Sequence, residues 1–200
     1  NDSKKEALEF SNKADREGTV FDAIKGADVF IGVSVGDLLT RKHIKTMSPD
    51  AIVFAMANPT PEIMPEEAKA GGAKVVGTGR SDMPNQVNNV LGFPYIFRGA
   101  LDVRATDITQ GMKMAATRAL AALAKEPVPD YISTAYDGAV MQYGPDYIIP
   151  KPFDRRVLLW EASAVAQAAV DEGVARVQPE DFSIKKYREE LEARLGQSYS

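Results

Sequence analysis

The chain has 200 residues, which is enough for one domain with a substantial core or for one domain with an appendage. Its formal net charge of −4 does not favour a nucleic-acid partner, since nucleic-acid binding normally needs a basic face. The lack of cysteine excludes disulfides and thiolate chemistry, and the single histidine excludes any site that needs two imidazoles. No window holds the roughly 20 apolar residues of a membrane helix, so we expect no membrane partner. The lack of cysteine is compatible with a reducing compartment, and we expect a cytoplasmic location.

The first 79 residues alternate short apolar runs with helical patterns. Predicted helices cover 2–14, 20–25, 38–47 and 65–70, and predicted strands cover 27–34, 51–57 and 73–79. The strand segments are apolar runs rich in β-branched residues, which is typical of strands buried on both faces of a parallel sheet. The alternation therefore predicts an α/β fold, a Rossmann-like parallel sheet with flanking helices.

A different pattern follows Gly79 and predicts C-terminal helices. A polar loop over 80–87 leads to Asn88, which opens a segment that runs to about residue 103. Further helices are predicted over 106–124, over 154–175 with Asp154 as a cap, and over 183–195 on the surface. Residues 126–152 are rich in proline and glycine and are predicted to form a long loop.

The ends of the three predicted strands differ sharply from the apolar strands themselves. Residues 32–34, 57–60 and 77–82 are small or polar. In open parallel sheets ligands bind at the carboxyl ends of the strands. These three segments therefore predict a ligand crevice at one edge of the sheet.

Long phrases of the sequence resemble bacterial malic enzymes, which oxidise and decarboxylate malate to pyruvate. The phrases are GADVFIGVS at 26–34, ANPTPEIMP at 57–65, TGRSDMPNQVNNVLGFP at 78–94, FRGALDV at 97–103 and GPDYIIPKPF at 144–153. They occur in the family's order and cover about residues 20–175. The resemblance implies that residues 1–200 are the C-terminal part of a malic-enzyme NAD(P)-binding domain, incomplete at its N-terminal side. Its core would span about 20–175, and 176–200 would be a helical tail.

The resemblance implies that three asparagines bind the substrate. Asn58 would lie beside the nicotinamide and malate, Asn88 would contact malate, and Asn89 is a weaker candidate. An amide offers two donors and one acceptor without charge, which suits the oxygens of a hydroxy acid. From the residues alone two other interpretations stay open. An Asn-Pro pair after a strand is commonly only a turn, and Asn88 with Asn89 is equally well explained as a helix cap.

The resemblance also implies where the cofactor, NAD or NADP, would lie. Val33 and Ser34 would line the dinucleotide together with Asn58, and Gly79 would let the chain pass close to it. The segment 35–38 departs from relatives, which often carry proline then glycine there, and an acid at Asp37 puts the cofactor role of that loop in doubt. The choice between NAD and NADP is open, because the deciding residue usually follows an earlier strand.

Several parts of a malic enzyme are expected outside this chain. It has no Gly-x-Gly-x-x-Gly turn to cradle the pyrophosphate. The family's catalytic tyrosine and lysine, and its acidic ligands for Mg²⁺ or Mn²⁺, precede this region, so we expect no catalytic residue and no metal ligand here. Tyr136 and Tyr147 fall outside the family's tyrosine motif.

The implied reaction transfers a hydride from malate to NAD or NADP. A metal then stabilises the enolate formed as carbon dioxide leaves, and an acid protonates it. The expected partners are malate, the rest of the malic-enzyme polypeptide and further copies in a homo-oligomer. Because the pyrophosphate cradle is missing and the chain starts at Asn1, we expect these 200 residues alone to be inactive. The alternatives are a non-catalytic, truncated nucleotide-binding or regulatory module and, less favoured, another oxidoreductase on the same scaffold.

Overall fold

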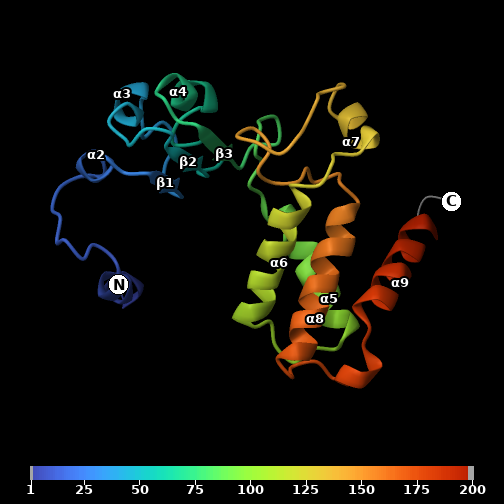
Figure 1. Ribbon diagram of the computed structural model, residues 1–200. Coiled ribbons are helices and arrows are strands. Elements are labelled where there is room, and N and C mark those ends of the chain that lie inside the picture. The colour runs from blue at the N-terminus through green and yellow to red at the C-terminus, as the bar shows by residue number, and fades with distance from the viewer. Residues whose placement is uncertain (1, 198–200) are drawn as a thin grey trace. The chain divides into compact units, whose positions relative to one another are not determined.

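The computed structural model describes residues 2–197 and forms two compact units, which meet in the chain between Val76 and Gly77 (Figure 1). Each unit is described by itself. The elements of the first unit are α1 (Asp2–Phe10), α2 (Val20–Ala23), β1 (Val29–Gly32), α3 (Arg41–Ile44), β2 (Ile52–Ala55), α4 (Pro65–Ala70) and the start of β3 (Val75–Thr78). The strands form one sheet in the order β1-β2-β3, and β1 pairs with β2 in parallel. The predicted α/β fold is confirmed, with shorter elements than the sequence predicts.

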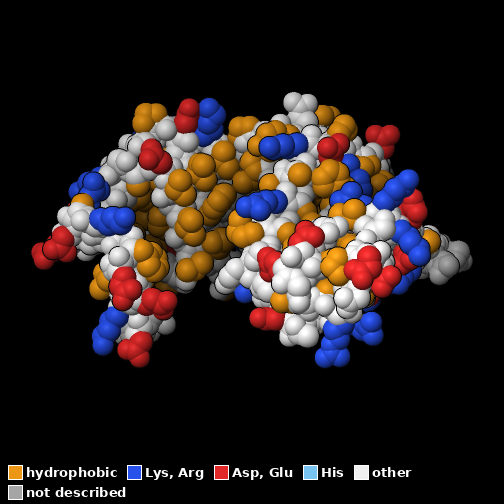
Figure 2. Space-filling model, turned by 60° about the horizontal axis from the view of Figure 1, so that its bottom comes forward, with side chains coloured by type: hydrophobic (Ala, Val, Ile, Leu, Met, Phe, Trp, Pro, Cys, Tyr) orange, Lys and Arg blue, Asp and Glu red, His pale blue; other side chains and the backbone are white. Residues whose placement is uncertain are grey.

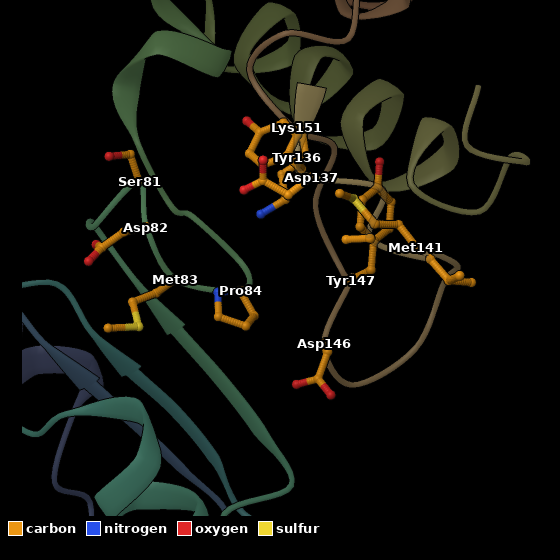
Figure 3. Close-up of a pocket in the computed structure, with 12 residues that line it drawn as sticks. Ser81, Asp82, Met83, Pro84, Tyr136, Asp137, Met141, Asp146, Tyr147 and Lys151 are labelled. Atoms are coloured by element: carbon orange, nitrogen blue, oxygen red, sulfur yellow. The ribbon is translucent and has the colours of Figure 1, made fainter. Parts of the chain in front are cut away.

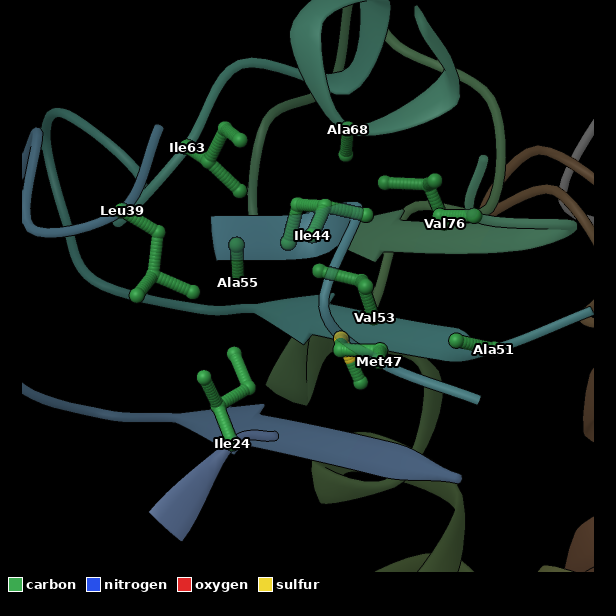
Figure 4. Close-up of a cluster of buried hydrophobic side chains, with 11 residues drawn as sticks. Ile24, Leu39, Ile44, Met47, Ala51, Val53, Ala55, Ile63, Ala68 and Val76 are labelled. Carbon is green, nitrogen blue, oxygen red and sulfur yellow. The ribbon is translucent and has the colours of Figure 1, made fainter. Parts of the chain in front are cut away.

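One face of this sheet carries the hydrophobic core of the first unit (Figure 4). Val53 and Ala55 of β2 are fully buried there. Ile44 of α3 and Ala68 of α4 pack against them, so both helices cover this face. Burying a side chain of this size stabilises a fold by roughly 1.5–3 kcal/mol.

The opposite face is exposed over β1. The register places Val29 beside Ile52 and Ile31 beside Phe54, and Ile31 is 62% exposed. In Figure 2 apolar side chains gather on the face of this unit that is turned to the viewer. The expectation that this strand is buried on both faces is therefore wrong within residues 2–197, because none of their helices covers Ile31.

The second unit is mainly helical. Its elements are η1 (Asn89–Leu91), α5 (Phe93–Asp102), α6 (Gln110–Leu123), α7 (Asp130–Ala135), the π-helical segment η2 (Leu158–Ala162), α8 (Ser163–Asp171), η3 (Pro179–Asp181) and α9 (Ile184–Gln197). Helices α5, α6 and α8 lie side by side around buried Met112 and Val165 (Figure 1). The predicted tail helix is observed as α9, and it buries Tyr187 and Leu191 in the same core.

Two details of this unit differ from the sequence prediction. The segment predicted as a loop over 126–152 contains α7, whose Ile132 is fully buried. Asp154 is buried, accepts a hydrogen bond from the backbone N–H of Arg156 at 3.0 Å, and pairs with its guanidinium at 2.7 Å. The helix predicted after Asp154 is observed, but its first part is the π-helical segment η2, and α8 begins only after it.

Glu161 in this π-helical segment is fully buried, and neither carboxyl oxygen has a hydrogen-bond partner among the described residues. Burial raises the pKa of this carboxyl from 4.5 to about 8. Because this pKa is raised in the folded state, the contribution of Glu161 to the free energy of unfolding is fully present below pH 4.5, where the carboxyl is protonated. It is lost as the pH rises through about 8. We expect Glu161→Met to remove this loss and to raise the free energy of unfolding at pH 9 by about 1–2 kcal/mol.

Urea unfolding of both proteins at pH 5 and pH 9 measures this effect. The exposed Glu180 of η3 supplies the control, and Glu180→Met should leave the pH dependence of the wild type unchanged. An equal pH dependence in the wild type and Glu161→Met would show that Glu161 does not ionise within this range.

Candidate functional site

The carboxyl ends of β1 and β2 carry three of the residues predicted to bind ligands. Val33 and Ser34 follow β1, and Asn58 lies just beyond β2. Gly32 and Ala55 are paired at the strand ends, so the two segments leave the sheet at the same edge. Val33 is 78% exposed, and Ser34 and Asn58 are exposed as well. An apolar side chain and an amide are thus open to a ligand at this edge.

A buried carboxylate that the sequence analysis missed joins these two strand ends. One oxygen of Glu62 accepts hydrogen bonds from the backbone N–H of Ser34 at 2.7 Å and from its hydroxyl at 3.2 Å. The other oxygen accepts from the backbone N–H of Ala57 at 3.0 Å. Burial by itself would raise the pKa of Glu62, but these hydrogen bonds outweigh it and lower the pKa below 4.5. Glu62 is therefore a buried carboxylate that positions both loops.

Two glycines allow this close arrangement. A side-chain carbon at Gly32 would lie 2.5 Å from the Glu62 carboxyl group. A carbon at Gly36 would lie 2.7 Å from the Thr60 side chain and 2.9 Å from its carbonyl oxygen. The loop also accommodates Asp37, in the segment that differs from the family's usual sequence. Asp37 adopts φ 57°, and its backbone N–H donates to the carbonyl of Pro61 at 3.0 Å. The loop after β1 therefore packs directly on the loop after β2.

The end of β3 begins the second unit and leaves space beside Gly79. A side-chain carbon at Gly79 would have only the Val87 carbonyl oxygen near it, at 3.9 Å. The backbone of Thr78 pairs with residues 85–87, through the N–H of Val87 at 2.8 Å. Gly79 thus has the room for a close ligand that its predicted role requires, and that role stays a prediction.

Asn85 is a second residue that the sequence analysis missed. Its side chain is buried, donates to the carbonyl of Pro145 at 2.7 Å and accepts from the backbone N–H of Ile148 at 2.9 Å. These partners are 60 and 63 positions away in the sequence. Asn85 therefore attaches the segment that precedes Asn88 to the loop that contains Pro145 and Ile148.

Asn88 is exposed, and its side-chain oxygen accepts from the backbone N–H of Val90 at 3.0 Å. The capping interpretation is therefore correct in geometry, although Asn88 caps the three-residue turn η1 and not an α-helix. Helix α5 begins only at Phe93, with Pro94 in its first turn, so Asn88 lies outside the first turn of an α-helix. The amide nitrogen of Asn88 and the exposed side chain of Asn89 still face solvent and can donate to a ligand.

Residues 2–197 bring no three histidine, cysteine or acidic side chains close enough together to hold a metal ion. Within the same residues no helix is both long and apolar enough to cross a membrane. The exposed residues Val33, Ser34 and Asn58 at the edge formed by β1 and β2 carry no charge, and the buried carboxylate of Glu62 binds the backbone of both loops.

The family model for the malic enzyme NAD-binding domain matches residues 3–133. The chain belongs to the malic enzyme family. The match includes the ends of β1, β2 and β3, with the predicted cofactor and substrate residues.

Curated malic enzymes from bacteria resemble the chain closely. It is 54% identical over 187 residues to the bifunctional malic/malolactic enzyme of Bacillus subtilis, which covers 92% of this chain and 42% of that protein. It is 59% identical over 159 residues to the NADP-dependent malic enzyme of Halomonas elongata, with coverage of 79% and 38%. The NAD-dependent malic enzyme of Rhizobium meliloti is 52% identical over 162 residues, with coverage of 80% and 21%. The chain therefore spans less than half the length of these malic enzymes.

Solved malic enzymes share the fold. The crystal structure of the malic enzyme from Pyrococcus horikoshii matches with a TM-score of 0.75 and 44% identity, over 90% of this chain and 38% of that one. The Entamoeba histolytica malic enzyme matches with a TM-score of 0.78 and 39% identity, over 93% and 35%. The expected Rossmann-like domain of a malic enzyme is thus confirmed.

Proposed function

We propose that this chain is part of an NAD- or NADP-dependent malic enzyme that converts malate to pyruvate and carbon dioxide. The observation that carries the proposal is the pair of loops that Glu62 joins at one edge of the sheet. In a chain of the malic enzyme family these loops present Val33, Ser34 and Asn58 to solvent. The resemblance assigns the same residues to the nicotinamide and the substrate.

The strand ends fit a nicotinamide dinucleotide. Exposed Val33 offers an apolar contact for a flat ring, and Asn58 offers donors and an acceptor without charge. Gly79 has open space where a side chain would obstruct a close ligand. When bound, the cofactor supplies the hydride chemistry. The residues of this chain bind it, orient it and hold the substrate's hydroxyl-bearing carbon beside it.

The substrate would be held by amides. The resemblance gives this role to Asn58 and Asn88, with Asn89 as a weaker candidate. Convergence of Asn58 and Asn88 on one malate molecule stays a prediction. Because the amide donors are fixed and uncharged, they can orient the reacting carbon without adding a further charge beside the positively charged nicotinamide ring.

The rest of the enzyme would supply what these residues do not. The resemblance assigns the acidic ligands of Mg²⁺ or Mn²⁺ and the acid–base pair to the proposed remainder of the malic-enzyme polypeptide. The exposed face around Val29 and Ile31 would be covered by the same remainder, because apolar β-strands rarely stay uncovered. A cytoplasmic location and a homo-oligomer complete the proposal.

We expect Asn58→Ala in the longer enzyme to lower kcat/KM for malate at least about tenfold, because a hydrogen bond that orients the reacting carbon is lost. Steady-state rates of pyruvate formation with Mn²⁺ and either cofactor measure this. Glu66→Ala, an exposed change in the first turn of α4 and outside these loops, is the control and should change kcat/KM less than about threefold. Equal rates for Asn58→Ala and the wild type would remove Asn58 from the site.

The 200-residue chain alone should form no pyruvate under the same conditions. Steady turnover by the chain alone would contradict the division of the site between this chain and a remainder. Inactivity of the longer protein as well would favour the non-catalytic module.

A further inference from the structure

A pocket of about 500 Å³ in the second unit contains groups that the proposed function does not use (Figure 3). The segment Ser81–Pro84 forms one side, and Tyr136, Asp137 and Lys151 lie across from it, with Tyr147 further along. Neither Asn88 nor Asn89 lines it. Its size lies within the range of small-molecule sites, about 300–1,000 Å³.

The pocket contains a buried ammonium group without an anionic partner. Lys151 is 9% exposed, and its side chain forms no ion pair with any residue of the described chain. Its nitrogen lies over the ring of Tyr136, 4.8 Å from the ring centre. Burial lowers the pKa of Lys151 accordingly. A buried cation is normally paired, so this one is poised to meet an anion that the pocket admits.

A second unpaired donor lies in the same pocket. Tyr147 is 4% exposed, and its hydroxyl has no hydrogen-bond partner of normal geometry in residues 2–197. An unpaired buried hydroxyl destabilises a fold, and a buried tyrosine usually finds an acceptor. A ligand that brings one acceptor atom to each of these two groups would satisfy both donors.

We propose that this pocket binds a small monocarboxylate, with the carboxylate oxygens accepting from Lys151 and Tyr147. The side chains of Met83, Pro84 and Met141 line the pocket beside these donors and suit a short aliphatic chain. A carboxylate satisfies both donors, because each of its two oxygens accepts independently.

The charges around the pocket select against ligands with more negative charge. Asp82, Asp137 and Asp146 all line it. Asp82 is already neutralised by the guanidinium of Arg80, at 2.9 and 2.7 Å. The ammonium of Lys151 balances one negative charge, so a second negative charge on the ligand would meet the carboxylate of Asp137. Dicarboxylates and inorganic phosphate should therefore bind more weakly than a monocarboxylate.

Equilibrium dialysis of the purified protein with radiolabelled propionate, at constant ionic strength, tests this site. The wild type should bind propionate saturably. Lys151→Met should raise the Kd at least about tenfold, and Tyr147→Phe about fivefold, because each removes one donor to the carboxylate. Unlabelled succinate and phosphate should compete at least about tenfold less well than unlabelled propionate.

Matched variants separate the pocket from general surface charge. Exposed Lys125 lies over the ring of Tyr143, so Lys125→Met and Tyr143→Phe repeat both changes outside the pocket and should leave the Kd unchanged. Both pocket variants should keep or raise the Tm of the wild type, since each removes an unpaired buried group. The proposal is overturned if the wild type shows no saturable propionate binding, or if folded Lys151→Met binds propionate as tightly as the wild type.

Discussion

Replacing Glu62 with glutamine should lower the free energy of unfolding by about 3 kcal/mol, the largest effect that we expect from a single conservative change. The glutamine keeps the size of the side chain, but its amide group turns two donors toward a backbone N–H that needs an acceptor. Either the Ser34 pair or the Ala57 bond is then lost, together with the negative charge that strengthens both. Urea unfolding at pH 7 measures the loss.

The same change should weaken NAD(P) binding at least about tenfold in the longer enzyme, since the loop at Ser34 is released. Glu66→Gln, an exposed change in the first turn of α4, is the matched control and should cost about 0.5 kcal/mol or less. A stability equal to that of the wild type, or unaltered cofactor affinity, would show that Glu62 does not position these loops.

The pH dependence of the Glu62 effect follows from its lowered pKa. A carboxyl whose pKa is lowered in the folded state contributes its full stability above its ordinary value of 4.5. That contribution is lost as the pH falls through the lower pKa of the folded state. The difference between Glu62→Gln and the wild type should therefore be constant near neutral pH and shrink below pH 4.5.

Substituting Gly99 with alanine should destabilise the second unit by about 3 kcal/mol. Gly99 lies on α5, where a side-chain carbon would come within 2.4 Å of the carbonyl oxygen of Ala162 and 2.9 Å of the side chain of Val165. The first neighbour is backbone and cannot rotate away, so α5 must separate from η2 and α8. Loss of the close contact exposes core around Met112 and Ala166.

Thermal unfolding compares this variant with a glycine that has space. Nothing lies within 4 Å of the side-chain position at Gly196 on α9, so Gly196→Ala should raise stability by about 0.5–1 kcal/mol through helix propensity alone. A Gly99→Ala protein that unfolds at the wild-type temperature would show that the two helices can move apart at little cost.

The order and type of the elements around the sheet could be predicted from the sequence, because each depends on local signals. The apolar runs gave the three strands, and Pro65 with Gly71 bounded α4 as predicted. The exposed face of β1 could not be predicted, since the pattern that buries Ile31 in a complete sheet is the same whether or not a covering element lies within the chain. Helix α7 was missed because prolines and glycines flank it on both sides.

The site was predictable only where the chemistry lies at strand ends. Val33, Ser34 and Asn58 follow directly from that rule and from the resemblance. Glu62 and Asn85 were missed because their partners are distant in the sequence, and burial of a polar side chain is a tertiary property. One signal was available for Glu62, an acid set between Pro61 and Ile63, together with Gly32 at the end of β1. Lys151 and Tyr147 carried no such signal.

A single carboxylate beneath two loops makes those loops one mechanical unit. Rebuilding the turn after β1 would also move the hydrogen bond that Glu62 accepts from Ala57, next to Asn58. A change in the backbone of one loop is therefore transmitted to the other loop at this edge of the sheet. Useful variants will have to alter both loops together, with Glu62 retained as their common support.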